Sequence, residues 1–261
     1  MNKKNNISST ALKALCVLET IAESSTPLSV SEVAKHIGMD KTTSYRMLIT
    51  LIDAGYVIRD NVSKRYTLSY KVVSLSRNLL AENEVSRLIR KALIELSKAT
   101  SETLHYSVLD NDETVLVQRV KGTQLVSIDF QIGDRSKLHC TSIGKAILAY
   151  QDYRFIERII ANGLPKMADN TIVNPDEFRK ELQRIRSQGY AFDNHEYSNS
   201  MRCIAVPIFE SGGYVKSGIS ISGPDTRFSL KKLEELKKPT LDASYELSKN
   251  LGGLAWKADI N

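Results

Sequence analysis

Residues 29–66 constrain the fold of this chain most, because they carry signals for two short helices, a tight turn and a hairpin in close succession. Ser29 and Glu32 have the spacing of a capping box, in which each side chain satisfies a free amide at the start of a helix. Gly38 is a stop signal for that helix, and Asp40 is a good cap for a second helix. Two helices separated by so short a turn are typical of a helix-turn-helix.

A polar hairpin is predicted directly after the second helix. Two strand-like runs, 56–59 and 65–68, flank the turn 60–64 and would form a wing. Arg and Lys side chains can donate to guanine or phosphate, and Thr and Tyr hydroxyls can bond phosphate. The candidate DNA-binding residues are therefore Lys41, Thr42, Thr43, Tyr45 and Arg46 on the second helix and Lys64 and Arg65 on the wing.

The alternative for this segment is a small helical hairpin with solvated polar faces. The helix spacing, the clustering of groove-compatible side chains and the adjacent basic hairpin together favour a winged helix-turn-helix that binds double-stranded DNA. Charge agrees with this: residues 1–83 hold 11 Lys and Arg against 7 Asp and Glu, so they carry +4 of the total +6. Such an excess also suits ordinary solubility, and it does not decide the question alone.

Length and composition set the remaining bounds. A chain of 261 residues is long enough for two domains. No apolar run approaches the roughly 20 residues of a membrane helix and the first six residues are polar, so we expect no membrane partner and a cytoplasmic location. The three cysteines, Cys16, Cys140 and Cys203, include no CxxC pair, which argues against a disulfide framework.

Helical patterns flank the winged module on both sides. Residues 9–21 predict a first helix with Cys16 in its core. Residues 71–83 predict a linker helix whose apolar stripe includes Val72, Leu75 and Leu79. That stripe is either core or a dimer seam, and we favour the seam, because a short helix between domains has little else to cover it.

From residue 85 the pattern predicts an α+β domain with helices around an antiparallel sheet and a ligand cavity. Expected strands cover 103–109, 114–120, 125–130, 203–209 and 214–222, and expected helices cover 85–96, 141–150, 154–160 and 176–187. A closing helix begins near Ser229, and Pro239 should bend or break it. The predicted division is 1–70 for the winged helix-turn-helix, 71–84 for the linker helix and 85–261 for the α+β domain.

Four blocks of the second domain, taken in order, resemble the IclR-type family of transcriptional regulators. They are GDRSKLHCTSIGKA at 133–146, GYAFD at 189–193, RCIAVP at 202–207, and SISGP at 220–224 with Arg227. The family usually has Pro where Lys137 stands and often Pro-Gly where Asn199 and Ser200 stand. The resemblance covers nearly the whole chain and implies a regulator, more often a repressor, that forms homodimers or dimers of dimers on a palindromic operator.

The resemblance also implies that the second domain binds an effector, a small organic acid such as a 2-oxo, hydroxy or sugar acid. In relatives that respond to glyoxylate, an aspartate, a cysteine and two serines line the pocket, which corresponds to Asp193, Cys203, Ser220 and Ser222. Two serines two residues apart on a strand face one side and can donate to a carboxylate. Asp193 can accept a bond from a ligand hydroxyl or hydrate. The amides of Ser142, Ile143 and Gly144, at a helix start, could hold the same anion.

Other functions remain open at this point. An activator that responds to an aromatic acid is one alternative, and an enzyme that acts on a small acid through Cys203 is another. A catalytic thiolate needs a base and an oxyanion site, which no spacing in one sequence can show. His139, Cys140, His195 and Cys203 lack the short spacing of a closed zinc site, so we expect no metal and no cofactor. Cys203 as a small buried hydrophobe at the pocket wall is the simplest role. His105 and His36 read as ordinary surface or half-buried residues.

Overall fold

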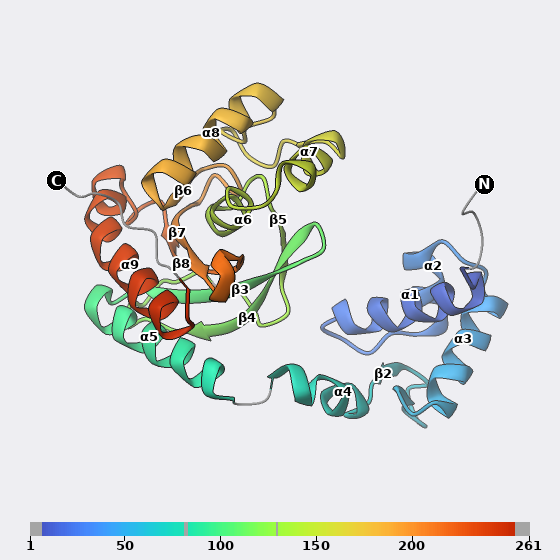
Figure 1. Ribbon diagram of the computed structural model, residues 1–261. Helices are drawn as coiled ribbons and strands as arrows, with labels where there is room; N and C mark the ends of the chain where they lie inside the picture. The colour runs from blue at the N-terminus through green and yellow to red at the C-terminus, as the bar shows by residue number, and fades with distance from the viewer. Residues whose placement is uncertain (1–6, 81–82, 129, 254–261) are drawn as a thin grey trace. The chain divides into compact units, whose positions relative to one another are not determined.

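The computed structural model describes residues 7–80, 83–128 and 130–253. The chain divides into two compact units, residues 1–81 and 82–261 (Figure 1). The first unit holds four helices and a two-stranded antiparallel sheet among its described residues, and the second holds a six-stranded sheet with helices on both faces. The predicted linker helix, residues 71–84, includes residues 81 and 82, which lie outside the described residues.

The first unit is a winged helix-turn-helix, as predicted. Val17, Leu48 and Tyr66 are among the side chains that fill its core. The two strands pair antiparallel with Ile58 opposite Thr67. The elements are α1 (Ser9–Glu23), α2 (Val30–Ile37), α3 (Lys41–Asp53), β1 (Val57–Arg59), β2 (Tyr66–Leu68) and α4 (Lys71–Leu80).

The helix boundaries of the first unit follow from its caps. The Ser29 hydroxyl accepts from the Glu32 amide, and the Glu32 carboxylate accepts from the Ser29 amide at 2.7 Å, so the capping box is complete. Gly38 ends α2 in the left-handed region at φ +64°, where a side chain would be strained. Asp40 then accepts from the Thr43 amide at 2.8 Å and begins α3.

Two apolar helix faces of the first unit lie at its surface. On α1, Val17 and Ile21 are buried, but Leu12 and Leu15 are about half exposed. Cys16 is also exposed, so the expectation that it lies in the core is wrong; the helix turns Val17 inward instead. On α4, Leu75 is 60% and Leu79 is 89% exposed. Within unit 1 the predicted stripe of α4 is therefore not a core face.

The second unit is built around one antiparallel sheet with strand order β5-β4-β3-β8-β7-β6. Helices α5 and α9 cover one face, and α6, α7 and α8 lie on the other (Figure 1). This is the predicted α+β class. Its elements are α5 (Glu84–Thr100), β3 (Thr103–Asp110), β4 (Glu113–Val120), β5 (Arg135–Lys137), α6 (Ser142–Leu148), α7 (Tyr153–Ala161), α8 (Pro175–Gln188), β6 (Ala191–Asn194), β7 (Met201–Phe209), the 3-10 turn η1 (Ser211–Gly213), β8 (Val215–Pro224) and α9 (Leu230–Asn250).

The two faces of the sheet differ in chemistry. Side chains alternate across a strand, so Leu104, Ile219 and Ile221 join the apolar core beneath α5 and α9. Their neighbours His105, Ser220 and Ser222 point to the opposite face and line a cavity. One face is therefore sealed by packing, while the other offers polar groups.

One strand predicted in the second unit is absent, and two short strands were not predicted. Residues 125–128 and 130 form no strand, and the strand that pairs with the outer edge of β4, at Glu113, Thr114 and Val115, is β5. Residue 129 lies outside the described residues. Strands β5 and β6 were not predicted, because three or four residues are too short for a clear period.

Helix α9 is not broken at Pro239. It runs from Leu230 to Asn250, although proline cannot donate to the preceding turn. A buried stripe that includes Leu233, Leu236 and Leu247 packs against the apolar core of the sheet. Proline in a helix interior costs on the order of 3 kcal/mol, and burial of three leucines, at roughly 1.5–3 kcal/mol each, exceeds that cost.

Candidate functional site

Helix α3 presents an exposed polar face in the first unit. Lys41, Thr42, Tyr45 and Arg46 are exposed, while Met47 and Leu48 on the other side are buried. Thr43 is half-buried, and its amide is held by the Asp40 cap. The exposed side chains occupy the first two turns, which is the part of a recognition helix that reaches base edges.

The two wing candidates have different surroundings. Lys64 is exposed in the turn at φ +60°, and no hydrogen bond or ion pair holds its side chain among the described residues. The Arg65 guanidinium instead donates to the Pro27 carbonyl at 2.7 Å and to the Glu32 carboxylate at 2.9 Å. Arg65 therefore ties the wing to the cap of α2, a contact between residues distant in sequence that spacing cannot reveal.

The second unit contains a cavity of about 360 Å³ on the polar face of the sheet. Side chains from all six strands of the sheet and from the start of α6 line it. The lining residues are His105, Ser107, Leu116, Phe130, Asp134, Arg135, Ser136, Thr141, Ser142, Ile143, Asp193, Tyr197, Met201, Cys203, Ser220 and Ser222. The structure thus brings together six of the seven predicted effector-site residues, and Gly144 is the one it does not bring there.

Strand register explains why four of these residues converge. Asp193 on β6 lies opposite Cys203 on β7, and Cys203 lies opposite Ser222 on β8. Ser220, two residues earlier on β8, lies opposite His105 on β3. Directly opposite residues share a face of the sheet and lie about 5 Å apart at Cβ. A row of polar groups therefore crosses four strands, with a step of two residues on β8 between Ser222 and Ser220.

Gly144 has a packing role in α6. Its amide donates to the Thr141 hydroxyl at 3.1 Å, which caps the helix. A Cβ added at Gly144 would lie 2.6 Å from the backbone of Leu138, so only glycine lets α6 approach the preceding loop this closely. This contact places Ser142 and Ile143 at the cavity wall.

Asp193 is a buried carboxyl with one satisfied and one free oxygen. Its Oδ1 accepts from the amides of Glu196 and Tyr197 at 2.8 and 3.3 Å, whereas Oδ2 has no hydrogen-bond partner among the described residues. Burial raises the pKa of Asp193 to about 7, and the charge of Glu196 adds to this rise. Near neutral pH its free oxygen can accept from a ligand hydroxyl, or donate when protonated.

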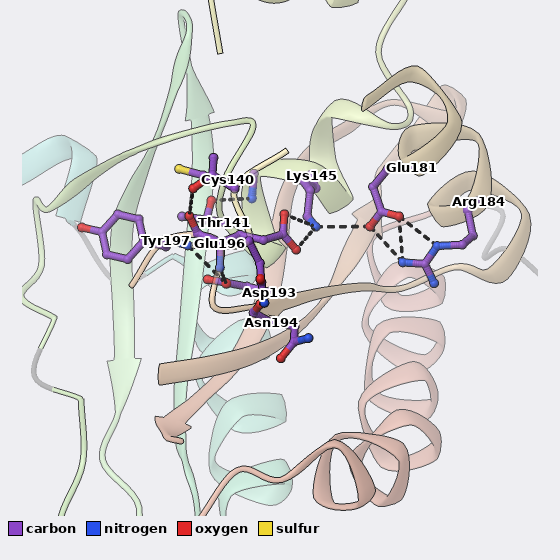
Figure 2. Close-up of polar contacts among 12 residues, drawn as sticks. Cys140, Thr141, Lys145, Glu181, Arg184, Asp193, Asn194, Glu196 and Tyr197 are labelled. Carbon is purple, nitrogen blue, oxygen red and sulfur yellow. Dashed lines mark hydrogen bonds and ion pairs between the residues drawn. The ribbon is translucent and has the colours of Figure 1, made fainter. Parts of the chain in front are cut away.

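Glu196, whose amide bonds Asp193, belongs to an ion-pair network with Lys145 and Glu181 (Figure 2). The fully buried Lys145 ammonium donates to both Glu196 oxygens at 2.5 and 2.6 Å and to Glu181 at 3.2 Å. Arg184 on α8 pairs with the same Glu181 carboxylate. The network holds the loop after β6, and with it the amides that orient Asp193.

Cys203 is fully enclosed at the cavity wall. Burial raises the pKa of its thiol well above the usual range, and the charge of Asp193 raises it further. A nucleophilic cysteine needs the opposite shift. The geometry therefore matches a small buried side chain at a pocket wall. Within residues 7–80, 83–128 and 130–253, no three His, Cys, Asp or Glu side chains gather closely enough to hold a metal ion.

Ten of the sixteen lining residues were not predicted from the sequence, and three of these ten carry rings: His105, Phe130 and Tyr197. His105 is only 3% exposed, against the expectation of a surface or half-buried residue. Its ring lies edge-on to Phe130 at 5.5 Å, and Phe130 contacts Tyr197 at 6.1 Å. One signal for His105 is in the sequence: Thr103, His105 and Ser107 alternate with apolar residues, which places them on one face. Phe130 and Tyr197 lie in loops and give no such signal.

Two family models match the chain. The model for the C-terminal domain of bacterial IclR transcriptional regulators matches residues 77–249, and the IclR helix-turn-helix model matches residues 10–61. No described helix has the length and apolar character needed to cross a membrane.

Relatives match over nearly their full length. The transcriptional regulator KdgR of Escherichia coli is 31% identical over 97% of this chain and 96% of its own. The crystal structure of the Thermotoga maritima IclR is 32% identical, with a TM-score of 0.73 over 93% of this chain and 98% of that one. An IclR homologue from Microbacterium hydrocarbonoxydans, solved with 4-hydroxybenzoate, is 21% identical and shares the fold at a TM-score of 0.77, over 93% and 99% of the two chains.

These matches confirm the family resemblance and the prediction of a DNA-binding regulator. The family comprises transcriptional regulators and not enzymes, so the alternative of an enzyme that uses Cys203 is set aside. The chain belongs to the IclR family of bacterial transcriptional regulators.

Proposed function

We propose that this regulator binds a palindromic operator as a homodimer, and that a small organic acid in the cavity of the second unit changes its operator affinity. The observation that carries the proposal is the convergence of Asp193, Cys203, Ser220, Ser222 and Ser142 on one cavity. Serine hydroxyls can donate to a carboxylate, and the free oxygen of Asp193 can bond a hydroxyl elsewhere on the ligand. A 2-oxo, hydroxy or sugar acid has this chemistry.

DNA binding is assigned to the exposed face of α3 with Lys64 of the wing. Lys41, Thr42, Tyr45 and Arg46 lie where a recognition helix contacts the major groove. Thr43 is half-buried and the Arg65 guanidinium is bonded to Glu32, so we expect smaller contributions to DNA binding from these two side chains. Two copies would read half-sites about one helical turn, or a multiple of it, apart.

An aromatic acid is the second candidate for the effector. His105, Phe130 and Tyr197 place rings at the cavity, and edge-to-face contacts with a ligand ring are favourable. The homologue solved with 4-hydroxybenzoate shares this fold. Repression, rather than activation, remains a prediction from the family resemblance, and a reporter fused to the operator would decide between them.

The experiment is fluorescence anisotropy of the purified full chain on DNA from upstream of its own gene, with a scrambled duplex as competitor. Pyruvate, gluconate and 4-hydroxybenzoate are each added to the complex. We expect competitor-resistant binding that at least one acid shifts. Operator binding that no acid changes would contradict the effector proposal, and an absence of sequence preference would contradict the operator proposal.

A further inference from the structure

His105 is a buried polar residue that the protein leaves unpaired. Neither ring nitrogen has a hydrogen-bond partner among the described residues, although the side chain is 3% exposed and lines the cavity. A buried polar group without a partner opposes folding, so such a group in a cavity points to a ligand. Burial, with the charge of Arg119, lowers the pKa of His105 to about 4, so its neutral ring offers one donor and one acceptor at neutral pH.

The other unpaired polar group of the cavity is Asp193, whose Oδ2 lies at the opposite end of the row of polar side chains from His105. His105 is on β3 and Asp193 is on β6, with β8 and β7 between them. Three strand spacings, together with the two-residue offset between Ser222 and Ser220, place the two backbones about 16 Å apart. A two-carbon acid is too short to meet both unpaired groups.

The charges of the cavity set the orientation of a ligand. Arg135, the one Lys or Arg among the described lining residues, is paired with Asp110 at 2.8 Å and Glu113 at 2.7 Å. Of the two lining carboxyls, Asp134 is exposed, so water screens its charge, whereas the buried Asp193 repels a carboxylate when it is ionised. A carboxylate is therefore better placed at the end of the cavity away from Asp193. There His105 lies directly across from Ser220, and both can donate to it.

Resting on the proposed function, we infer that His105 is an effector-binding residue and that the effector is an acid with two ends. Its carboxylate is held between His105 and Ser220, and a second oxygen-bearing group several carbon atoms away bonds Asp193.

The test is isothermal titration calorimetry on the full chain with ligands of two lengths. Gluconate, galactonate and 4-hydroxybenzoate carry a carboxylate and a distant hydroxyl, whereas glycolate carries both groups on two carbons. We expect at least one of the long acids to bind ten times more tightly than glycolate. Equal affinity for long and short acids would overturn the two-ended assignment.

His105→Phe tests the imidazole itself. Phenylalanine keeps the ring contact with Phe130 but cannot hydrogen-bond, so we expect affinity to fall at least tenfold while the Tm of the unliganded protein stays unchanged or rises. His105→Gln keeps a donor and an acceptor, so we expect it to bind the acid more tightly than His105→Phe does. If the phenylalanine variant does not fold, the glutamine variant alone is compared with the wild type. The matched control is His139→Gln, because His139 is equally buried but lies outside the cavity, with Nε2 2.9 Å from the Pro165 carbonyl oxygen.

The outcomes separate this inference from the proposed function. If Ser222→Ala loses acid binding while His105→Phe binds like the wild type, the cavity stands and the role of His105 is overturned. A fall in affinity and Tm shared by His105→Phe and His139→Gln would show a structural role and overturn it as well. If no acid of the panel binds, or if Ser222→Ala leaves acid affinity unchanged, the small-acid proposal fails and this inference fails with it.

Discussion

Asp193 shows at the level of one residue how a candidate binding site opposes stability. Its pKa is 3.8 in an unfolded chain and about 7 when folded, so between these values the folded state keeps a proton that the unfolded state has lost. Stability therefore falls as pH rises through this window. Buried carboxyls of this kind are retained when they serve a site.

We predict that Asp193→Asn flattens the pH dependence of stability. The variant has no carboxyl to ionise, so its free energy of unfolding should fall less than that of the wild type between about pH 4 and pH 7, by a difference on the order of a few kcal/mol. Urea denaturation across that range measures it. Parallel profiles for the two proteins would show that Asp193 does not carry the shift.

Ser222→Ala should weaken binding of the effector acid by tenfold or more. A ligand group left without its hydrogen-bond partner in a buried site costs about 1–3 kcal/mol, and alanine removes the donor without changing the strand. Ser217→Ala is the matched control, because Ser217 is buried on the same strand but does not line the cavity. If both variants bind the acid like the wild type in calorimetry, Ser222 is not a ligand contact.

At the level of elements, helix α3 is positioned by its cap and core, and its function depends on the exposed face. Arg46→Ala should lower operator affinity at moderate salt by about 1–3 kcal/mol, as loss of a base or phosphate contact does. Lys13→Ala removes an equal charge from α1 and controls for the general field of the unit. Anisotropy that gives the same loss for both variants would refute a specific role for Arg46.

The elements also show how far the sequence determines the fold. Ser29, Glu32, Gly38 and Asp40 specify their helix ends through local chemistry, and the structure has those ends where the sequence predicts them. That α9 continues through Pro239 depends on the packing of the helix on the sheet, which is a tertiary effect. The partner of β4 at Glu113–Val115 is likewise set by tertiary pairing, with β5 there and no strand at 125–128.

The cavity could be predicted only in part, because its opening depends on tertiary packing. Ser220 and Ser222 share a face by strand period, and the family resemblance indicated Asp193 and Cys203. Whether that face is open or packed depends on α6, which Gly144 brings close to Leu138. The unpaired state of His105 depends on what other elements leave uncovered, and no local pattern contains that information.

At the level of the whole molecule, the apolar stripe of α4 is the predicted dimer seam. Leu79→Asp places a charge on a side chain that is 89% exposed in the single chain. We expect the variant to be monomeric in sedimentation velocity and to lose affinity for a two-half-site operator. Asn78→Asp adds the same charge one position off the stripe and should leave the dimer intact; if Leu79→Asp also remains dimeric, the seam lies elsewhere.

The proposed function requires that the cavity and the DNA-binding face share one free energy of coupling. Such coupling is reciprocal, so the factor by which an acid changes operator affinity must equal the factor by which the operator changes acid affinity. The most direct test is to titrate the acid that binds best into the full chain with and without saturating operator, and to compare the ratio with the shift in operator affinity measured by anisotropy. We expect the two factors to be equal and clearly different from one, and we expect both effects to be lost in Ser222→Ala. An acid that binds equally well to the free and the operator-bound protein would contradict it.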